Sequence, residues 1–190
     1  AQETLELPGP GRLDPQEWPD VPRLWLYKAV FSNDELRRPG WYWNPRMQRV
    51  ILPVKKDGKV IYWQGRGFDP GRPKAINPVA NREGLVAKYG DGDWVALTED
   101  ILSAAKVGSV GEAWALLGTV LSYSTALALA EGGRPVLLML DDDPAGRRGA
   151  AEASKTLSLL GVWNKQVYFG RDPKGVDRST IKAKAKELLP

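Results

Sequence analysis

The 190-residue sequence contains no cysteine and no histidine. Without cysteine, neither a disulfide framework nor a thiol nucleophile can form. The absence of histidine as well excludes an ordinary zinc site and a Ser-His-Asp triad. Any catalysis must therefore come from carboxylates, Lys or Arg, hydroxyl groups and hard metal ions such as Mg²⁺ or Mn²⁺.

Long apolar runs are absent too. No stretch approaches the ~20 apolar residues of a membrane-spanning helix, and no signal-peptide pattern opens the chain. The sequence begins with Ala1 and not with Met, which suggests a processed or excised piece of a larger protein. We expect no membrane partner and a cytoplasmic location.

Charge is distributed unevenly along the chain. Residues 1–36 hold three basic and seven acidic side chains, residues 37–90 hold twelve and three, and residues 91–190 hold twelve and thirteen. A basic middle beside an Asp-bearing C-terminal half indicates a polyanion track that leads to a metal site. The alternative is that Lys and Arg only solvate a surface.

The first half of the chain predicts an arm and a small α+β subdomain. Residues 1–20 are rich in Pro, Gly and acids and are typical of an extended arm. Residues 21–31 suit a short amphipathic helix, and Ser32 with Glu35 matches a capping box that starts a second one. We expect the subdomain to cover residues 21–91.

A β-hairpin is the main element of this subdomain. Two β-rich segments, 50–54 and 59–64, flank Asp57-Gly58, a strong turn signal. Basic residues and aromatic residues interleave around it, a composition that suits single-stranded nucleic acid. The alternative is that the aromatics pack the hairpin and core, which we expect of at least half of them. The residues concerned are Arg46, Arg49, Lys55, Lys56, Lys59, Arg66, Arg72 and Lys74, with Trp41, Trp43, Tyr62 and Trp63.

Strands and helices alternate after Gly92. This order predicts an α/β domain over residues 92–190, with a parallel sheet covered by helices on both faces. The predicted strands are 94–98, 113–117, 136–140 and 166–169, and the predicted helices are 99–107, 122–131, 144–160 and 179–189.

Acidic residues gather where these strands end. Asp141, Asp142 and Asp143 follow a buried strand directly, and closely packed acids are tolerated best around a cation. Glu99, Gly118-Thr119 and the 171–177 loop fall at the same carboxyl edge, where ligands of such sheets bind. Asp143 alone could instead be a helix N-cap before Pro144.

Two motif blocks resemble a known family. The series ALTED, LLGT and LLMLDDDPAGRRGA is similar to the TOPRIM domain of primases and topoisomerases. Upstream, RVILPVKKDGKVIYWQGR and PKAINP resemble the basic N-terminal part of the polymerase domain of DnaG-type primases. The lead-in RLWLYKAVFSNDEL also looks like that domain. The resemblance covers residues 21–178 and lacks the family's zinc ribbon and any helicase P-loop.

The resemblance implies roles for individual residues. Glu99 would manage the proton of the primer 3′-hydroxyl. Glu99, Asp141 and Asp143 would also bind Mg²⁺ or Mn²⁺, with Asp142 turned away. The loop after the last strand would supply a further metal ligand in Asp172, while Asp177 could cap the last helix. Template strand or nucleotide would be held by Arg49, Lys55, Arg66, Lys74, Asn77 and Arg147.

The sequence departs from the family pattern after the first strand of the domain. The family has Glu-Gly-x-x-Asp there, whereas this chain has Asp100 at the glycine position and Ser103 at the second acid. Either Asp100 substitutes as a ligand from a different angle, or one metal ion is held more weakly.

The resemblance implies a phage-like DNA primase core. It would make short RNA primers on single-stranded DNA from ribonucleoside triphosphates, at replication sites of a bacterial or phage-infected cell. A separate helicase or zinc-ribbon module would be a further partner. The alternatives are a catalytically weak or inactive single-stranded-DNA-binding module, a TOPRIM metal-dependent nuclease and, least supported, a receiver-like signalling domain.

Overall fold

The computed structural model describes residues 3–190, so the first two residues of the predicted arm lie outside it. The chain divides into two compact units, Ala1–Ala80 and Asn81–Pro190. This boundary precedes the one predicted after residue 91. The reason is β5 (Ala87–Gly90), which pairs antiparallel with β7 (Glu112–Ala115) of the second unit's sheet.

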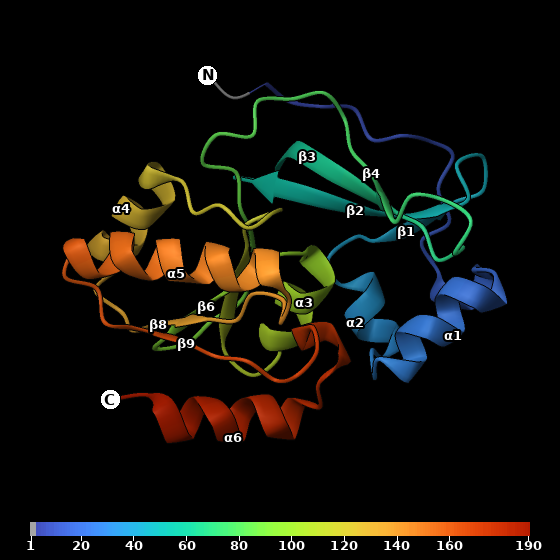
Figure 1. Cartoon of the computed structure of the whole chain (residues 1–190). Coiled ribbons are helices and arrows are strands. Elements are labelled where there is room, and N and C mark those ends of the chain that lie inside the picture. The colour runs from blue at the N-terminus through green and yellow to red at the C-terminus, as the bar shows by residue number, and fades with distance from the viewer. Residues whose placement is uncertain (1–2) are drawn as a thin grey trace. The chain divides into compact units, whose positions relative to one another are not determined.

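The first unit combines short helices with an antiparallel sheet in the order β1-β2-β3-β4 (Figure 1). Its elements are η1 (Pro15–Glu17), α1 (Asp20–Lys28), α2 (Asn33–Arg37), β1 (Tyr42–Asn44), β2 (Arg49–Lys56), β3 (Lys59–Arg66) and β4 (Ala75–Ile76).

Local sequence signals explain two of these elements. The predicted capping box is confirmed, because Ser32 Oγ accepts the Glu35 amide while Glu35 Oε1 accepts the Ser32 amide, both at 3.2 Å. The predicted hairpin is also confirmed, with Asp57 and Gly58 at φ 52° and 76°. Positive φ at both central residues matches the right-handed twist of paired strands.

The second unit is built on a five-stranded sheet in the order β5-β7-β6-β8-β9. β6 pairs in parallel with β7 and β8, and β8 with β9, so the predicted α/β architecture is confirmed. The remaining bounds are β6 (Val95–Thr98), α3 (Ile101–Val107), α4 (Tyr123–Gly132), β8 (Val136–Leu138), α5 (Pro144–Leu159), β9 (Asn164–Gln166), η2 (Pro173–Gly175) and α6 (Arg178–Leu188).

Helices cover both faces of this sheet, as expected. Leu97 and Leu138 face one side, where they pack with Ala126 of α4 and with Ala150 and Leu157 of α5. Figure 1 shows α6 on the opposite side from α4 and α5. Alternation of side chains along the strands therefore buries both faces and leaves the carboxyl edge for polar residues.

Candidate active site at the carboxyl edge of the second sheet

Two carboxylates face each other at the ends of neighbouring strands. Glu99 directly follows β6, and Asp141 follows the extension of β8, whose Met139 amide donates to the Leu97 carbonyl at 2.8 Å. The parallel pairing of β6 with β8 brings these two residues to one edge although they are far apart in sequence. The structure therefore brings these two predicted site residues together.

The electrostatics of this pair are unfavourable without a cation. Burial, with the nearby charge of Asp141 as second cause, raises the pKa of Glu99 to about 8. Burial also raises the pKa of Asp141, against the lowering effect of the nearby Lys174 ammonium. Among the described residues, the buried atoms Glu99 Oε1 and Asp141 Oδ1 accept no hydrogen bond from another residue, while a hydrogen bond between the two carboxyl groups also raises the pKa of Glu99. Buried carboxylate oxygens normally have a bonding partner, so the pair is suited to bind a cation.

Asp143 serves as a helix cap beside this pair. Its Oδ1 accepts the Gly146 amide at 2.7 Å, which makes it the N-cap of α5, as the alternative interpretation expected. Its charge also contributes to the raised pKa of Glu99, after burial and Asp141. Capping and proximity to the pair therefore coexist in one side chain.

Glycines allow the first turns of α5 to approach the strand ends. A Cβ on Gly146 would overlap the Asp141 carbonyl oxygen and lie 3.0 Å from Glu99 Oε1. A Cβ on Gly149 would overlap the carbonyl oxygen of Thr119. The spacing of these glycines places both on one face of the helix.

Asp100 uses its carboxylate to cap helix α3. Its Oδ1 accepts the Ser103 amide at 2.8 Å, and its Oδ2 accepts the Ser103 hydroxyl at 3.2 Å. Asp100 is thus the N-cap of α3, and Ser103, fully buried, completes the cap. Asp100 bonds to Ser103, and it affects the Glu99–Asp141 pair through its charge, which helps to raise the pKa of Glu99.

Lys174 lies in the acidic cluster and was not among the predicted site residues. Its Nζ lies 2.9 Å from Asp100 Oδ2 and 2.8 Å from Asp172 Oδ2. Burial opposes its charged form, but Asp100 and Asp172 outweigh this and hold the pKa of its ammonium above the usual range. A lysine two residues after the predicted ligand Asp172 was the signal that could have indicated this.

The donor set fits a divalent cation only in part. Within residues 3–190, no group of three or more Asp and Glu side chains is arranged so that it could hold a metal ion. The Glu99–Asp141 pair, with Asp143 beside it, fits Mg²⁺ or Mn²⁺ because Mg²⁺ often uses one or two carboxylates plus water and substrate phosphates. Asp100 and Asp172 instead pair with Lys174.

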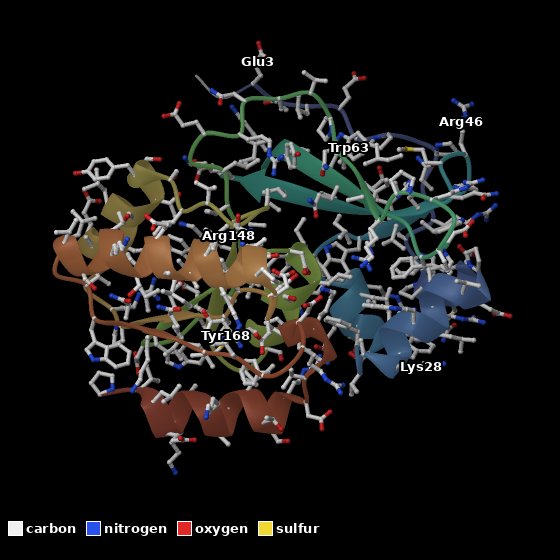
Figure 2. The ribbon with its side chains drawn as sticks, in the orientation of Figure 1. Glu3, Lys28, Arg46, Trp63, Arg148 and Tyr168 are labelled. Carbon is white, nitrogen blue, oxygen red and sulfur yellow. The ribbon has the colours of Figure 1, made fainter. Side chains whose placement is uncertain are left out.

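Arg147 is held at the start of α5. Its Nε donates to Asp142 Oδ1 at 2.7 Å, and its guanidinium lies 4.2 Å from the ring centre of Tyr168, which is labelled in Figure 2. Asp142 Oδ2 accepts the Gly170 amide, so this carboxylate is directed at Arg147 and the following loop, as expected. Arg147 remains half exposed.

Arg49 has a structural environment in the first unit. It is 2% exposed, and its Nη1 donates to the carbonyl of Pro73 at 2.8 Å and that of Gly65 at 3.2 Å. The guanidinium therefore fastens β2 to β3 and to the segment before β4. Its predicted contact with a template strand stays a prediction.

The other predicted binding residues of the first unit are more accessible. Lys55, Lys74 and Asn77 are exposed, and Arg66 is half-buried over the rings of Trp25 and Phe68, 5.4 Å from each centre. Of the interleaved aromatics, Trp41, Trp43 and Tyr62 are buried in the core. Trp63, labelled in Figure 2, is the half-buried one.

One curated relative is similar to this chain in sequence. The chain is 30% identical over 182 residues to the DNA primase of Aquifex aeolicus (strain VF5), a match that covers 86% of the chain and 36% of the relative. The chain thus spans about a third of the length of that relative. No family model matches the chain.

Solved structures agree at the level of fold. A DnaG primase catalytic domain bound to single-stranded DNA matches with a TM-score of 0.70 at 20% identity, over 90% of this chain and 72% of that one. The chain has the fold of a DnaG-type primase catalytic core. The primase fragment of the bacteriophage T7 primase-helicase protein shares this primase fold, with a TM-score of 0.62 at 15% identity, over 85% of this chain and 71% of that one.

The comparisons favour neither the nuclease nor the inactive-module alternative. The primase-core fold also agrees with the order of the two motif blocks. Among the helices of residues 3–190, none has the length and apolar character needed to cross a bilayer.

Proposed function

We propose that this chain is the polymerase core of a DNA primase, which makes short RNA primers on single-stranded DNA by metal-dependent nucleotidyl transfer. The observation that carries the proposal is the half-buried Glu99–Asp141 pair, with one buried oxygen on each residue, at the strand ends of a primase-core fold. Similarity in sequence to a curated DNA primase supports it.

The site residues divide the chemistry among them. Glu99, as a carboxylate, accepts the proton of the primer 3′-hydroxyl, and its raised pKa suits a group that exchanges protons near neutral pH. Asp141 and Asp143 hold Mg²⁺ or Mn²⁺ together with the substrate. When bound, such an ion stabilises the charge that develops on the phosphoryl oxygens. Arg147 contacts the phosphates from the first turn of α5, where helix N-termini favour anions.

The first unit binds the template. Lys55, Lys74 and Arg66 pair with phosphates, Asn77 contributes a polar contact, and Trp63 stacks on a base. Arg49 supports this surface from within by its contacts to two carbonyls.

Ribonucleoside triphosphates are the proposed substrates, and a helicase or a zinc-ribbon module is a proposed partner. The T7 relative of this fold is itself described as a primase-helicase protein. We place the protein at replication sites in the cytoplasm of a bacterial or phage-infected cell.

Primer synthesis by the purified chain tests the proposal. With Mn²⁺ or Mg²⁺, labelled ribonucleotides and single-stranded templates, we expect short oligonucleotides. Asp141→Ala should abolish them and leave single-strand binding nearly intact, whereas the exposed control Asp93→Ala should retain both. No product from the wild type, even with a zinc-ribbon partner added, would contradict the proposal.

A further inference from the structure

The acidic cluster of the second unit contains a cation of its own. Lys174 Nζ bridges Asp100 Oδ2 and Asp172 Oδ2 at 2.9 and 2.8 Å, distances typical of charge-assisted hydrogen bonds. Its side chain is 12% exposed, so the ion pairs are largely shielded from water. Shielded pairs are screened little by salt.

The backbone of Lys174 is fixed to α3, which holds the ammonium in place. Its amide donates to Ser103 Oγ at 3.2 Å, and its carbonyl accepts Lys106 Nζ at 2.9 Å. Ser103 and Lys106 are both buried. The residue is therefore tied at its amide, its carbonyl and its ammonium.

Asp100 has little capacity for another ligand. One of its oxygens accepts the Ser103 amide, and the other accepts both the Ser103 hydroxyl and Lys174 Nζ. Within residues 3–190, the buried Glu99 Oε1 and Asp141 Oδ1, in contrast, accept no hydrogen bond from another residue. Among the described residues, Lys174 is thus bonded directly to Asp100 and Asp172, whereas it reaches Asp141 only through its charge.

We propose that Lys174 replaces a divalent ion, so that the chain binds a single Mg²⁺ or Mn²⁺, at the Glu99–Asp141 pair beside Asp143. A second divalent ion between Asp100 and Asp172 would have to displace the tethered ammonium or lie beside a like charge. Ser103 contributes to the same arrangement, because its hydroxyl oxygen accepts the hydrogen bond of the Lys174 amide. An acidic side chain at this position would repel the Asp100 carboxylate. The inference rests on the proposed function for the divalent ion itself.

The number of bound Mn²⁺ ions, measured by electron paramagnetic resonance without nucleotide, tests this. We expect one ion per wild-type chain and two per Lys174→Met chain, because the variant removes the ammonium and frees two carboxylates. Lys174→Arg should bind one, since it keeps a cation, and so should Lys182→Met, which removes an exposed lysine of α6. Asp172→Asn should also keep one ion, because Asp172 is not a ligand of it.

The outcomes separate the inference from the proposed function. Two ions on the wild type, one ion on folded Lys174→Met, or loss of the ion in Asp172→Asn would each overturn the role of Lys174 and leave primer synthesis standing. No ion on the wild type without nucleotide would overturn the inference, while the primer-synthesis assay, in which the substrate is present, decides the proposed function separately. If Lys174→Met does not fold, the wild-type and Asp172→Asn counts still decide the question.

Discussion

Glu99 shows how one side chain couples stability to function. Partial burial, with the nearby charge of Asp141, raises its pKa from the usual 4.5 to about 8 in the folded protein. The folded state therefore holds a proton on Glu99 that the unfolded state releases between these values. Between these pH values the folded state binds more protons than the unfolded state. The free energy of unfolding therefore falls as pH rises through this window.

Glu99→Gln should remove this dependence. At pH 5 the variant and the wild type should have similar melting temperatures, because Glu99 is protonated in the fold and resembles Gln. At pH 8 in EDTA the variant should be more stable by several degrees, given ~2–4 °C per kcal/mol for a chain of this size. Thermal unfolding at the two pH values measures this, with the exposed Glu131→Gln on α4 as control. Equal stability of Glu99→Gln and wild type at pH 8 would contradict the buried pair.

Arg49 provides the second prediction for a single residue. Arg49→Ala leaves the carbonyls of Gly65 and Pro73 without their donor and removes a buried stem. We expect a loss of about 2–3 kcal/mol in the free energy of unfolding, as for hydrogen bonds to charged groups. Urea denaturation measures it, and the exposed Arg46→Ala, labelled in Figure 2, should change little. Unchanged stability with lost strand binding would instead show that Arg49 acts on the template.

Residue identity indicated the acids of the site and left their partners undetermined. Asp141, Asp143 and Glu99 could be assigned because each follows a predicted strand. The ion pair of Lys174 with Asp100 spans 74 positions of sequence, so the local sequence signals only the other half of the bridge, to Asp172. The same holds for the burial of Arg49, which depends on a carbonyl 24 positions away.

Helix α5 is the element that positions the site. Its first residues are placed by the Asp143 cap and by close approach at Gly146 and Gly149. Gly146→Ala should push α5 away from the Asp141 carbonyl and cost ~1–3 kcal/mol, the usual range for overpacking. Gly132→Ala in α4 meets only a contact of 3.9 Å and should be nearly neutral. Chemical denaturation compares the two, and equal effects would contradict the tight packing of α5.

Strong periodicity and caps made most elements of the second unit predictable. The exception is β9, expected at 166–169 and observed at Asn164–Gln166. The residues of β9 are polar and partly exposed at a sheet edge. The strand was therefore predicted too late in the sequence, because the hydrophobic pattern favours the apolar residues that follow it. β5 was missed for a similar reason, because AKYG is short and its strand identity comes from pairing with β7.

At the scale of the molecule, the basic charge of the first unit predicts a salt-dependent affinity. Single-strand binding should weaken linearly in log Kd against log salt, with about 0.7 of slope per phosphate contact. The double variant Lys55→Ala, Lys74→Ala should lower that slope by roughly 1.4. Lys182→Ala, Lys186→Ala on α6 changes the net charge equally and should leave the slope unaltered. Fluorescence anisotropy measures both, and equal slopes would place the strand elsewhere.

Asp100 and Asp143 each cap a helix and lie in the acidic cluster, so the two backbone amides that they cap can report cation binding. The Ser103 amide is bound by Asp100 Oδ1 and the Gly146 amide by Asp143 Oδ1. A cation that draws on a capping carboxylate changes the protection of its amide against hydrogen exchange. With Mg²⁺ added, exchange at Gly146 should change and exchange at Ser103 should not, because only the Asp143 half takes the ion. Magnetic resonance could thus locate a diamagnetic ion at the start of one helix, in a protein that is making no primer at all.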